Sequence, residues 1–131
     1  MERLPVDPYM RPKILAVDDS KAVRIIVRKA LEPFACDVNE ATNGFNGLFS
    51  MEKEQPDLIL LDVGMPIMNG VEMLTLLKSH PQLKKIPVIM MTSPSDHRII
   101  SKIIELGVSN HIMKPYTPDA LVAAVRRILT L

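Results

Sequence analysis

Five polar side chains stand at the ends of short apolar stretches of this sequence: Asp18, Asp19, Asp62, Thr92 and Lys114. Carboxylates placed close together repel one another, and a hard divalent cation with oxygen ligands relieves that repulsion. Mg²⁺ suits a site that combines a few carboxylates with several water molecules. A carboxylate beside a metal, an ammonium and a hydroxyl can attack a phosphoryl group while the cations neutralise the phosphoryl oxygens. If the fold gathers these side chains, the chemistry they support is phosphoryl transfer to Asp62.

Each of these residues also has an ordinary structural explanation when it is taken alone. Asp18 and Asp19 can cap the helix that follows them. Thr92 is a β-branched residue of the kind that strands favour, and Lys114 can be a solvated surface lysine. A chance placement of all five side chains at strand ends is improbable, so the combination favours a site.

The apolar stretches alternate with amphipathic segments in a strand–helix order that repeats five times along the chain. Leu58–Leu61 is unbroken and short, which is typical of a strand buried on both faces, whereas Cys36–Ala41 is less apolar and fits the sheet edge. This order predicts an α/β fold with a parallel sheet between two helix layers. The carboxyl ends of parallel strands share one edge, so the polar side chains should meet in one cleft. The expected strands are Lys13–Val17, Cys36–Ala41, Leu58–Leu61, Pro87–Thr92 and Asn110–Met113.

Caps and helical spacing place the helices. Ser20, Asn43 and Thr117 are expected to start the first, second and fifth helices, and Gly107 is expected to end the fourth in a left-handed conformation. Apolar residues at helical spacing are expected to face the core. They are Val23, Ile26, Val27, Ala30, Leu31, Phe45, Leu48, Phe49, Val71, Leu74, Leu77, Ile99, Ile100, Ile103, Ile104, Leu121, Ala124, Val125 and Ile128.

The composition is that of one ordinary domain. Of the 131 residues 47% are hydrophobic and 24% are charged, and the net charge of +1 argues against nucleic acid or a membrane as the direct partner. Cys36 is the only cysteine, so no internal disulfide is possible, which fits the reducing cytoplasm. No apolar run approaches the ~20 residues of a membrane span. We expect an irregular extension over residues 1–12 and a domain over 13–131.

The motifs around the polar side chains resemble those of response-regulator receiver domains of two-component signalling. The resemblance covers about residues 13 to 130 and implies the flavodoxin-like (βα)5 fold with strand order 2-1-3-4-5. The motifs are Val17-Asp18-Asp19-Ser20, Leu61-Asp62-Val63-Gly64-Met65-Pro66 with Asn69-Gly70, Met91-Thr92-Ser93 and Lys114-Pro115-Tyr116.

The resemblance assigns roles to individual residues. It implies that Asp62 is the phosphoacceptor and that Asp19 and Asp62 bind Mg²⁺ directly. Asp18 would hold the ion directly or through water, and the main-chain carbonyl of Gly64 would be a further ligand. Thr92, Ser93 and Lys114 are implied to bind the phosphoryl group and to respond to it. The resemblance further implies a cis Lys114–Pro115 bond. The switch and output face would include His111, Pro115 and Tyr116.

The resemblance also implies the partners. The phosphoryl donor would be a phosphohistidine on a sensor histidine kinase or a histidine phosphotransfer protein. A downstream protein would bind the face made by the fourth helix, the fifth strand and the fifth helix. We expect a signalling protein, free-standing in the manner of chemotaxis receivers, that catalyses only its own phosphorylation and dephosphorylation. A receiver cut from a longer regulator would have the same sequence features.

Three positions depart from the commoner receiver pattern. Gly64 has no side chain two residues after Asp62, and Pro94 stands two residues after Thr92. Both flank the path of a water that attacks the acyl phosphate, so the lifetime of the phosphorylated state stays open. His111 occupies the position where relatives usually carry Tyr or Phe. It is either the inward-turning switch residue or an ordinary half-exposed strand residue.

Two other functions on a similar fold are less consistent with the sequence. A phosphohydrolase of the haloacid-dehalogenase type needs a second acid two residues after its nucleophile, and Gly64 stands there. A flavin-binding module needs a phosphate loop rich in Ser, Thr or Gly after the first strand. The acids Asp18 and Asp19 stand there instead, and they would repel an anionic phosphate.

Overall fold

A computed structural model of the chain describes residues 11–131. The expected extension over residues 1–12 therefore lies almost wholly outside the described residues. Strands and helices alternate as expected. The strands are β1 (Lys13–Val17), β2 (Asp37–Ala41), β3 (Leu58–Asp62), β4 (Val88–Thr92) and β5 (Asn110–Met113). The helices are α1 (Lys21–Leu31), α2 (Gly44–Lys53), α3 (Gly70–Ser79), α4 (Ile100–Glu105) and α5 (Pro118–Arg126), with 3₁₀ turns η1 (Leu83–Lys85) and η2 (Pro94–Ile99).

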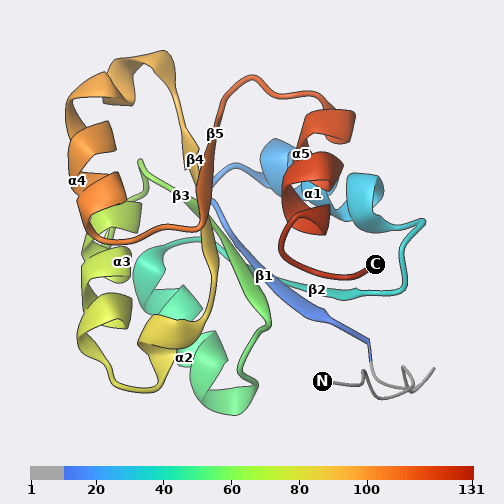
Figure 1. Ribbon diagram of the computed structural model, residues 1–131, viewed down its shortest axis with the longest axis horizontal. Helices are drawn as coiled ribbons and strands as arrows, with labels where there is room; N and C mark the ends of the chain where they lie inside the picture. Colours follow the sequence, from blue (N-terminus) through green and yellow to red (C-terminus); the bar gives the residue numbers. More distant parts are fainter. Residues whose placement is uncertain (1–10) are drawn as a thin grey trace.

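The strands form one parallel five-stranded sheet in the order β2-β1-β3-β4-β5, which confirms the predicted order 2-1-3-4-5. The less apolar β2 is an edge strand, as its composition indicated. Figure 1 shows α1 and α5 on one face of the sheet and α2, α3 and α4 on the other. The fold is therefore the expected flavodoxin-like arrangement, with β3 at its centre.

Each face of the sheet carries its own apolar core. Alternate residues of β3 explain the division, because Leu58 and Leu60 pack toward α1 and α5 while Ile59 and Leu61 pack toward α2 and α3. All four side chains are fully buried. A strand that is buried on both faces has to be apolar at every position until it reaches Asp62.

The helix boundaries agree with the local sequence signals. The side chains of Ser20, Asn43 and Thr117 each accept a hydrogen bond from the backbone N–H three residues later. Gly107 has a φ of 86°, the left-handed conformation expected at a helix end. These signals act within a few residues, which is why the sequence reveals them.

The prediction that Phe45 and Phe49 face the core is wrong. Their exposed fractions are 59% and 54%, and they lie one turn apart on the outer side of α2. The inner side carries glycine, because a Cβ at Gly47 would meet the side chains of Met73 and Val17. At Gly47 the helix leaves no room for a larger side chain, although Met51 of the same helix is buried in the core, and the two aromatic rings lie on the outer side.

Two isoleucines expected in the core are also exposed. Ile26 on α1 is 42% exposed and Ile104 on α4 is 59% exposed, whereas Val27 and Ile103 beside them are buried. The fourth helix is shorter than its apolar pattern suggested, because the chain forms the 3₁₀ turn η2 before it becomes α-helical. Within residues 11–131, no helix is long and apolar enough to cross a membrane.

Candidate functional site

Asp62 is the last residue of β3, and a close backbone approach holds it there. Gly70, the first residue of α3, lies against this strand end, and a Cβ at position 70 would collide with the carbonyl of Asp62. The Gly70 N–H also donates to the carbonyl of Val63 at 2.9 Å. The loop after β3 thus returns to the strand end, and glycine is the residue that permits the contact.

Three carboxylates meet beside this strand end, as the sequence predicted. One carboxylate oxygen each from Asp18, Asp19 and Asp62 lies within 4.8 Å of the other two. Asp18 is 1% exposed and Asp62 is 7% exposed, while Asp19 is open to solvent. Carboxylate oxygens are the ligands that Mg²⁺ prefers, and an open side leaves room for its waters, so the acidic cluster is compatible with Mg²⁺.

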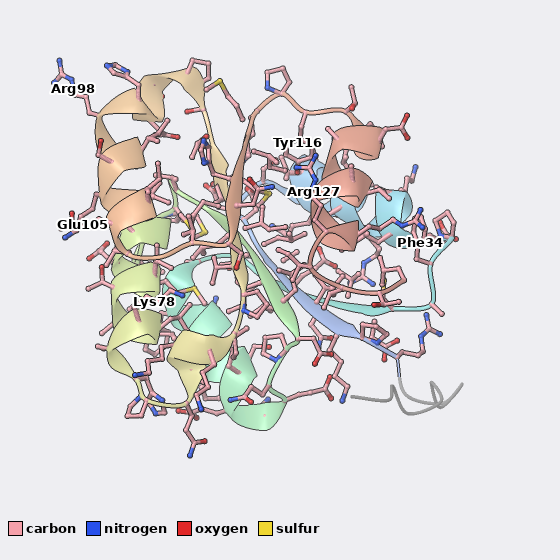
Figure 2. All side chains as sticks on the ribbon, viewed as in Figure 1. Phe34, Lys78, Arg98, Glu105, Tyr116 and Arg127 are labelled. Carbon is pink, nitrogen blue, oxygen red and sulfur yellow. The ribbon has the colours of Figure 1, made fainter. Side chains whose placement is uncertain are left out.

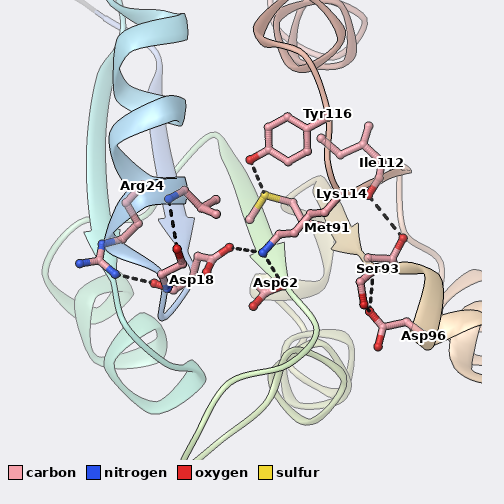
Figure 3. A network of polar contacts seen from close by, with 12 residues as sticks. Asp18, Arg24, Asp62, Met91, Ser93, Asp96, Ile112, Lys114 and Tyr116 are labelled. Atoms are coloured by element: carbon pink, nitrogen blue, oxygen red, sulfur yellow. Dashed lines mark hydrogen bonds and ion pairs between the residues drawn. The ribbon is translucent and has the colours of Figure 1, made fainter.

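Lys114 reaches into the acidic cluster from the end of β5. Its Nζ lies 2.7 Å from Asp18 Oδ2 and 3.1 Å from Asp62 Oδ1 (Figure 3). The main-chain N–H of Lys114 donates to the carbonyl of Thr92 at 2.6 Å, which holds the Lys114 backbone beside the end of β4. The ammonium therefore compensates part of the negative charge that two buried carboxylates bring together.

This compensation is incomplete. Burial and the nearby charge of Asp18 raise the pKa of Asp62 from its usual 3.8 to about 6, although Lys114 acts in the opposite direction. Burial alone would lower the pKa of Lys114, but its hydrogen bonds to Asp18 and Asp62 outweigh burial and raise it. The site therefore still favours an additional cation or a proton.

Thr92 and Ser93 lie at the predicted strand end, but their hydroxyls point to other groups. Thr92 is fully buried, and its Oγ donates to the carbonyl of Ile112 on β5 at 3.4 Å. Ser93 is the N-cap of η2, and its Oγ and N–H both donate to the carboxylate of Asp96. In this structure the two hydroxyls hold the loop after β4 rather than contact Asp62.

The remaining predicted residues surround the cluster on the β5 side. His111 is half-buried on β5 and lies opposite Met90 of β4. It directly precedes Ile112, whose carbonyl accepts from the Thr92 hydroxyl. The Lys114–Pro115 peptide is cis, as the resemblance implied. Tyr116 is half-buried, its hydroxyl donates to Met91 Sδ at 3.4 Å, and burial raises its pKa to about 12.

Open space adjoins the site in two places. Gly64 is exposed, and a Cβ there would have no neighbour within 4 Å. An apolar pocket of about 290 Å³ also lies beside the lysine and is lined by Val23, Ile26, Lys114, Pro115 and Tyr116. Lys114 thus belongs both to this pocket and to the acidic cluster.

Sequence reasoning missed one residue that contacts the acids. Arg24 on α1 donates from Nη1 to the main-chain carbonyl of Asp18 at 2.7 Å (Figure 3). The sequence did offer a signal for this contact: Arg24 lies one turn into the helix that follows the acid pair Asp18 and Asp19.

The comparison with family models decides the identity of the domain. The model of the response regulator receiver domain matches residues 14–126. The chain belongs to the response regulator receiver family. This receiver therefore shares the phosphorelay role of that family, with a fold and an acidic strand edge that agree with it.

Individual relatives support the same assignment. The receiver is 36% identical over 122 residues to sporulation initiation phosphotransferase F of Bacillus subtilis, and the match covers 93% of this chain and 97% of that protein. It superposes on the chemotaxis response regulator CheY4 of Vibrio cholerae with a TM-score of 0.84 and 30% identity, covering 92% and 100% of the two chains.

A third relative is much longer than this receiver. The sensor histidine kinase CheAY of Helicobacter pylori is 35% identical over 120 residues, which are 90% of this chain but 15% of the kinase. Relatives of this family thus include short chains and parts of large signalling proteins.

Proposed function

We propose that Asp62 accepts a phosphoryl group from a phosphohistidine on a sensor histidine kinase or a histidine phosphotransfer protein. A carboxylate oxygen of Asp62 attacks the phosphorus, a P–O bond forms as the P–N bond breaks, and the released imidazole takes a proton from solvent. The convergence of Asp62, Asp18 and Lys114 within hydrogen-bond distance carries this proposal. We expect the exchange in the cytoplasm, where the thiol of Cys36 stays reduced.

The acidic cluster fits a resident Mg²⁺, because its donors are carboxylate oxygens and its negative charge is only partly compensated by Lys114. Asp19 and Asp62 would hold the ion, with Asp18 and the Gly64 carbonyl as further ligands. When bound, the ion supplies positive charge that stabilises the oxygens of the phosphoryl group. Lys114 supplies a second positive charge from the protein itself, and Thr92 a hydroxyl once it turns from Ile112.

The apolar pocket beside Lys114 supports a docking place for the phosphodonor. It is formed by α1 and the segment after β5, and Ile26 at its edge is 42% exposed. A donor that buries this apolar edge can present its phosphohistidine at the neighbouring Asp62. This contact would also orient the phosphohistidine of the donor toward Asp62.

The output would use the face made by α4, β5 and α5. Apolar side chains are already exposed there, since Ile104 on α4 is 59% exposed and Met113 on β5 is 48% exposed. Arg98 on η2 and Glu105 on α4 point away from the sheet (Figure 2). A partner that recognises this face would respond to movement of Thr92 and His111 beneath it.

The phosphoacceptor is tested by incubating the protein with acetyl phosphate and Mg²⁺. We expect intact-mass spectrometry to show one added phosphoryl group, labile to hydroxylamine as an acyl phosphate is, and we expect Asp62→Asn to abolish it. Asp57→Asn is the matched control, because Asp57 comes directly before the same strand, at its other end from Asp62, and accepts from Lys13 N–H. Label that persists in Asp62→Asn and maps to Ser, Thr or His would contradict the assignment.

A further inference from the structure

Arg24 links an edge strand of the sheet to the acidic cluster. Its Nε lies 2.9 Å from Glu40 Oε1 on β2, and its Nη1 donates to the Asp18 carbonyl at 2.7 Å. The Arg24 side chain is only 14% exposed. One guanidinium thus makes two charge-assisted contacts in a largely buried setting, where such contacts are strong.

Asp18 is held at each of its polar groups. Its N–H donates to the carbonyl of Ala41 at 3.0 Å, and its Oδ1 accepts from Ser20 N–H at 2.8 Å. Its Oδ2 accepts from Lys114 Nζ at 2.7 Å, and its carbonyl accepts from Arg24. The main chain at Asp18 therefore sets the direction in which the Asp18 carboxylate points. The carboxylate in turn holds Lys114 beside Asp62.

Glu40 holds the arginine in place. It also accepts from Arg28, at 2.7 Å to Nη2 and 3.2 Å to Nε, and the hydrogen bonds from Arg28 and Arg24 lower the pKa of Glu40 despite opposing burial. The two arginines lie one turn apart on α1 and share this partner. Arg28 directs its other contact to the Val38 carbonyl on β2, away from the cluster.

We propose that Arg24 is a positioning residue for the acidic cluster. Anchored by Glu40, it fixes the main chain of Asp18 so that the Asp18 carboxylate faces the metal site and holds Lys114 beside Asp62. This role rests on the proposed function, because it concerns the binding of Mg²⁺ and phosphoryl transfer at the same site. Arg24 itself touches neither Asp62 nor its phosphoryl group in this scheme.

Removal of Arg24 would have opposite effects on Mg²⁺ affinity if the residue acts only through its charge and if it positions Asp18. Loss of a positive charge near the carboxylates would strengthen Mg²⁺ binding by Coulomb attraction alone. If Asp18 is no longer fixed, Mg²⁺ binding would weaken. Removal of residues that orient metal ligands commonly costs on the order of tenfold in affinity. The sign of the change therefore distinguishes the two effects.

The test compares Arg24→Ala with Arg28→Ala. Both variants remove one charge and one partner of Glu40, but only the first removes a contact to Asp18. From amide chemical shifts in an Mg²⁺ titration, we expect Kd to rise about tenfold in Arg24→Ala and to stay within about twofold of wild type in Arg28→Ala. In the metal-free protein, the Ser20 amide should shift in Arg24→Ala and not in Arg28→Ala.

Arg24→Lys provides a second variant that keeps the charge but replaces the guanidinium fork with one donor atom. We expect its Kd to lie between those of wild type and Arg24→Ala. A Kd equal to that of wild type would overturn the positioning role. Unchanged or tighter Mg²⁺ binding in Arg24→Ala would overturn it as well. A wild-type protein that binds no Mg²⁺ would instead refute the proposed metal site, and this inference with it.

Discussion

Asp62 is a carboxylate that the folded chain keeps partly out of water, and this has a consequence for stability. Its pKa is raised from 3.8 to about 6, so the folded protein holds a proton that the unfolded chain releases. Relative to higher pH, the proton on Asp62 stabilises the folded protein; this stabilisation is complete below pH 3.8 and is lost as the pH rises through 6. In metal-free protein, we expect the free energy of unfolding of wild type to fall relative to Asp62→Asn by about 2 kcal/mol between roughly pH 4.5 and 7.5.

Urea denaturation in the presence of a chelator measures this difference. Asp62→Asn is the reference because it keeps the shape of the side chain and cannot ionise. A gap between the two proteins that stays constant over this pH range would mean that Asp62 ionises with an ordinary pKa. Addition of Mg²⁺ at neutral pH should narrow the gap, since a cation offsets the same buried charge.

The loop between β3 and α3 contains a strained turn. Ile67 has a φ of 68°, a conformation that a β-branched residue rarely adopts, and the N–H of Met68 donates to the Pro66 carbonyl across it at 2.7 Å. The Ile67 side chain is 82% exposed, so little packing offsets the strain. We expect Ile67→Gly to raise the free energy of unfolding by about 1 kcal/mol, because glycine adopts positive φ without a steric penalty.

Ile67→Val is the matched control for this turn, because valine is also β-branched and keeps the strain. Chemical denaturation should show no gain for it. If Ile67→Gly is less stable than wild type and Ile67→Val is unchanged, the exposed isoleucine side chain contributes more than the backbone conformation costs.

At the scale of the whole molecule, β4 and β5 lie between the acidic cluster and the proposed output face. The Thr92 hydroxyl donates to the carbonyl of Ile112, the residue after His111. If a phosphoryl group on Asp62 draws Thr92 toward it, this contact is lost and the side chain of His111 can turn inward. A shift from mostly off to mostly on takes about 5 kcal/mol of differential interaction, and a few charge-assisted hydrogen bonds of ~1.5–3 kcal/mol each supply it.

Beryllofluoride with Mg²⁺ imitates the phosphoryl group and permits an NMR test. We expect amide shifts over residues 93–116 in wild type and a much smaller response on α4 and α5 in His111→Ala. His97→Ala is the control, since His97 is exposed on η2 and lies outside the sheet. Amides of residues 93–116 that do not move while Asp62 is occupied would place the output on another face, with α1 the first candidate.

The sequence by itself determined the order of strands and helices, the helix caps and the residues that end the strands. These features depend on neighbours within a few positions: the cap at Ser20 joins residues three apart, and the buried β3 is an unbroken apolar run. Parallel pairing then places Asp62 and Lys114 at one edge of the sheet. The family motifs added roles for these residues that no periodicity could assign.

Only the tertiary structure decided which side chains meet and which face outward. The ion pair of Lys114 with Asp18 joins residues 96 positions apart, and the Thr92 hydroxyl selects a carbonyl on β5 over the acidic cluster. Phe45 lies outside because the inner side of α2 carries glycine, and a Cβ at Gly47 would already meet the side chains of Met73 and Val17. Such outcomes depend on distances between packed elements, and these distances come from the summed volumes of many side chains rather than from any local pattern.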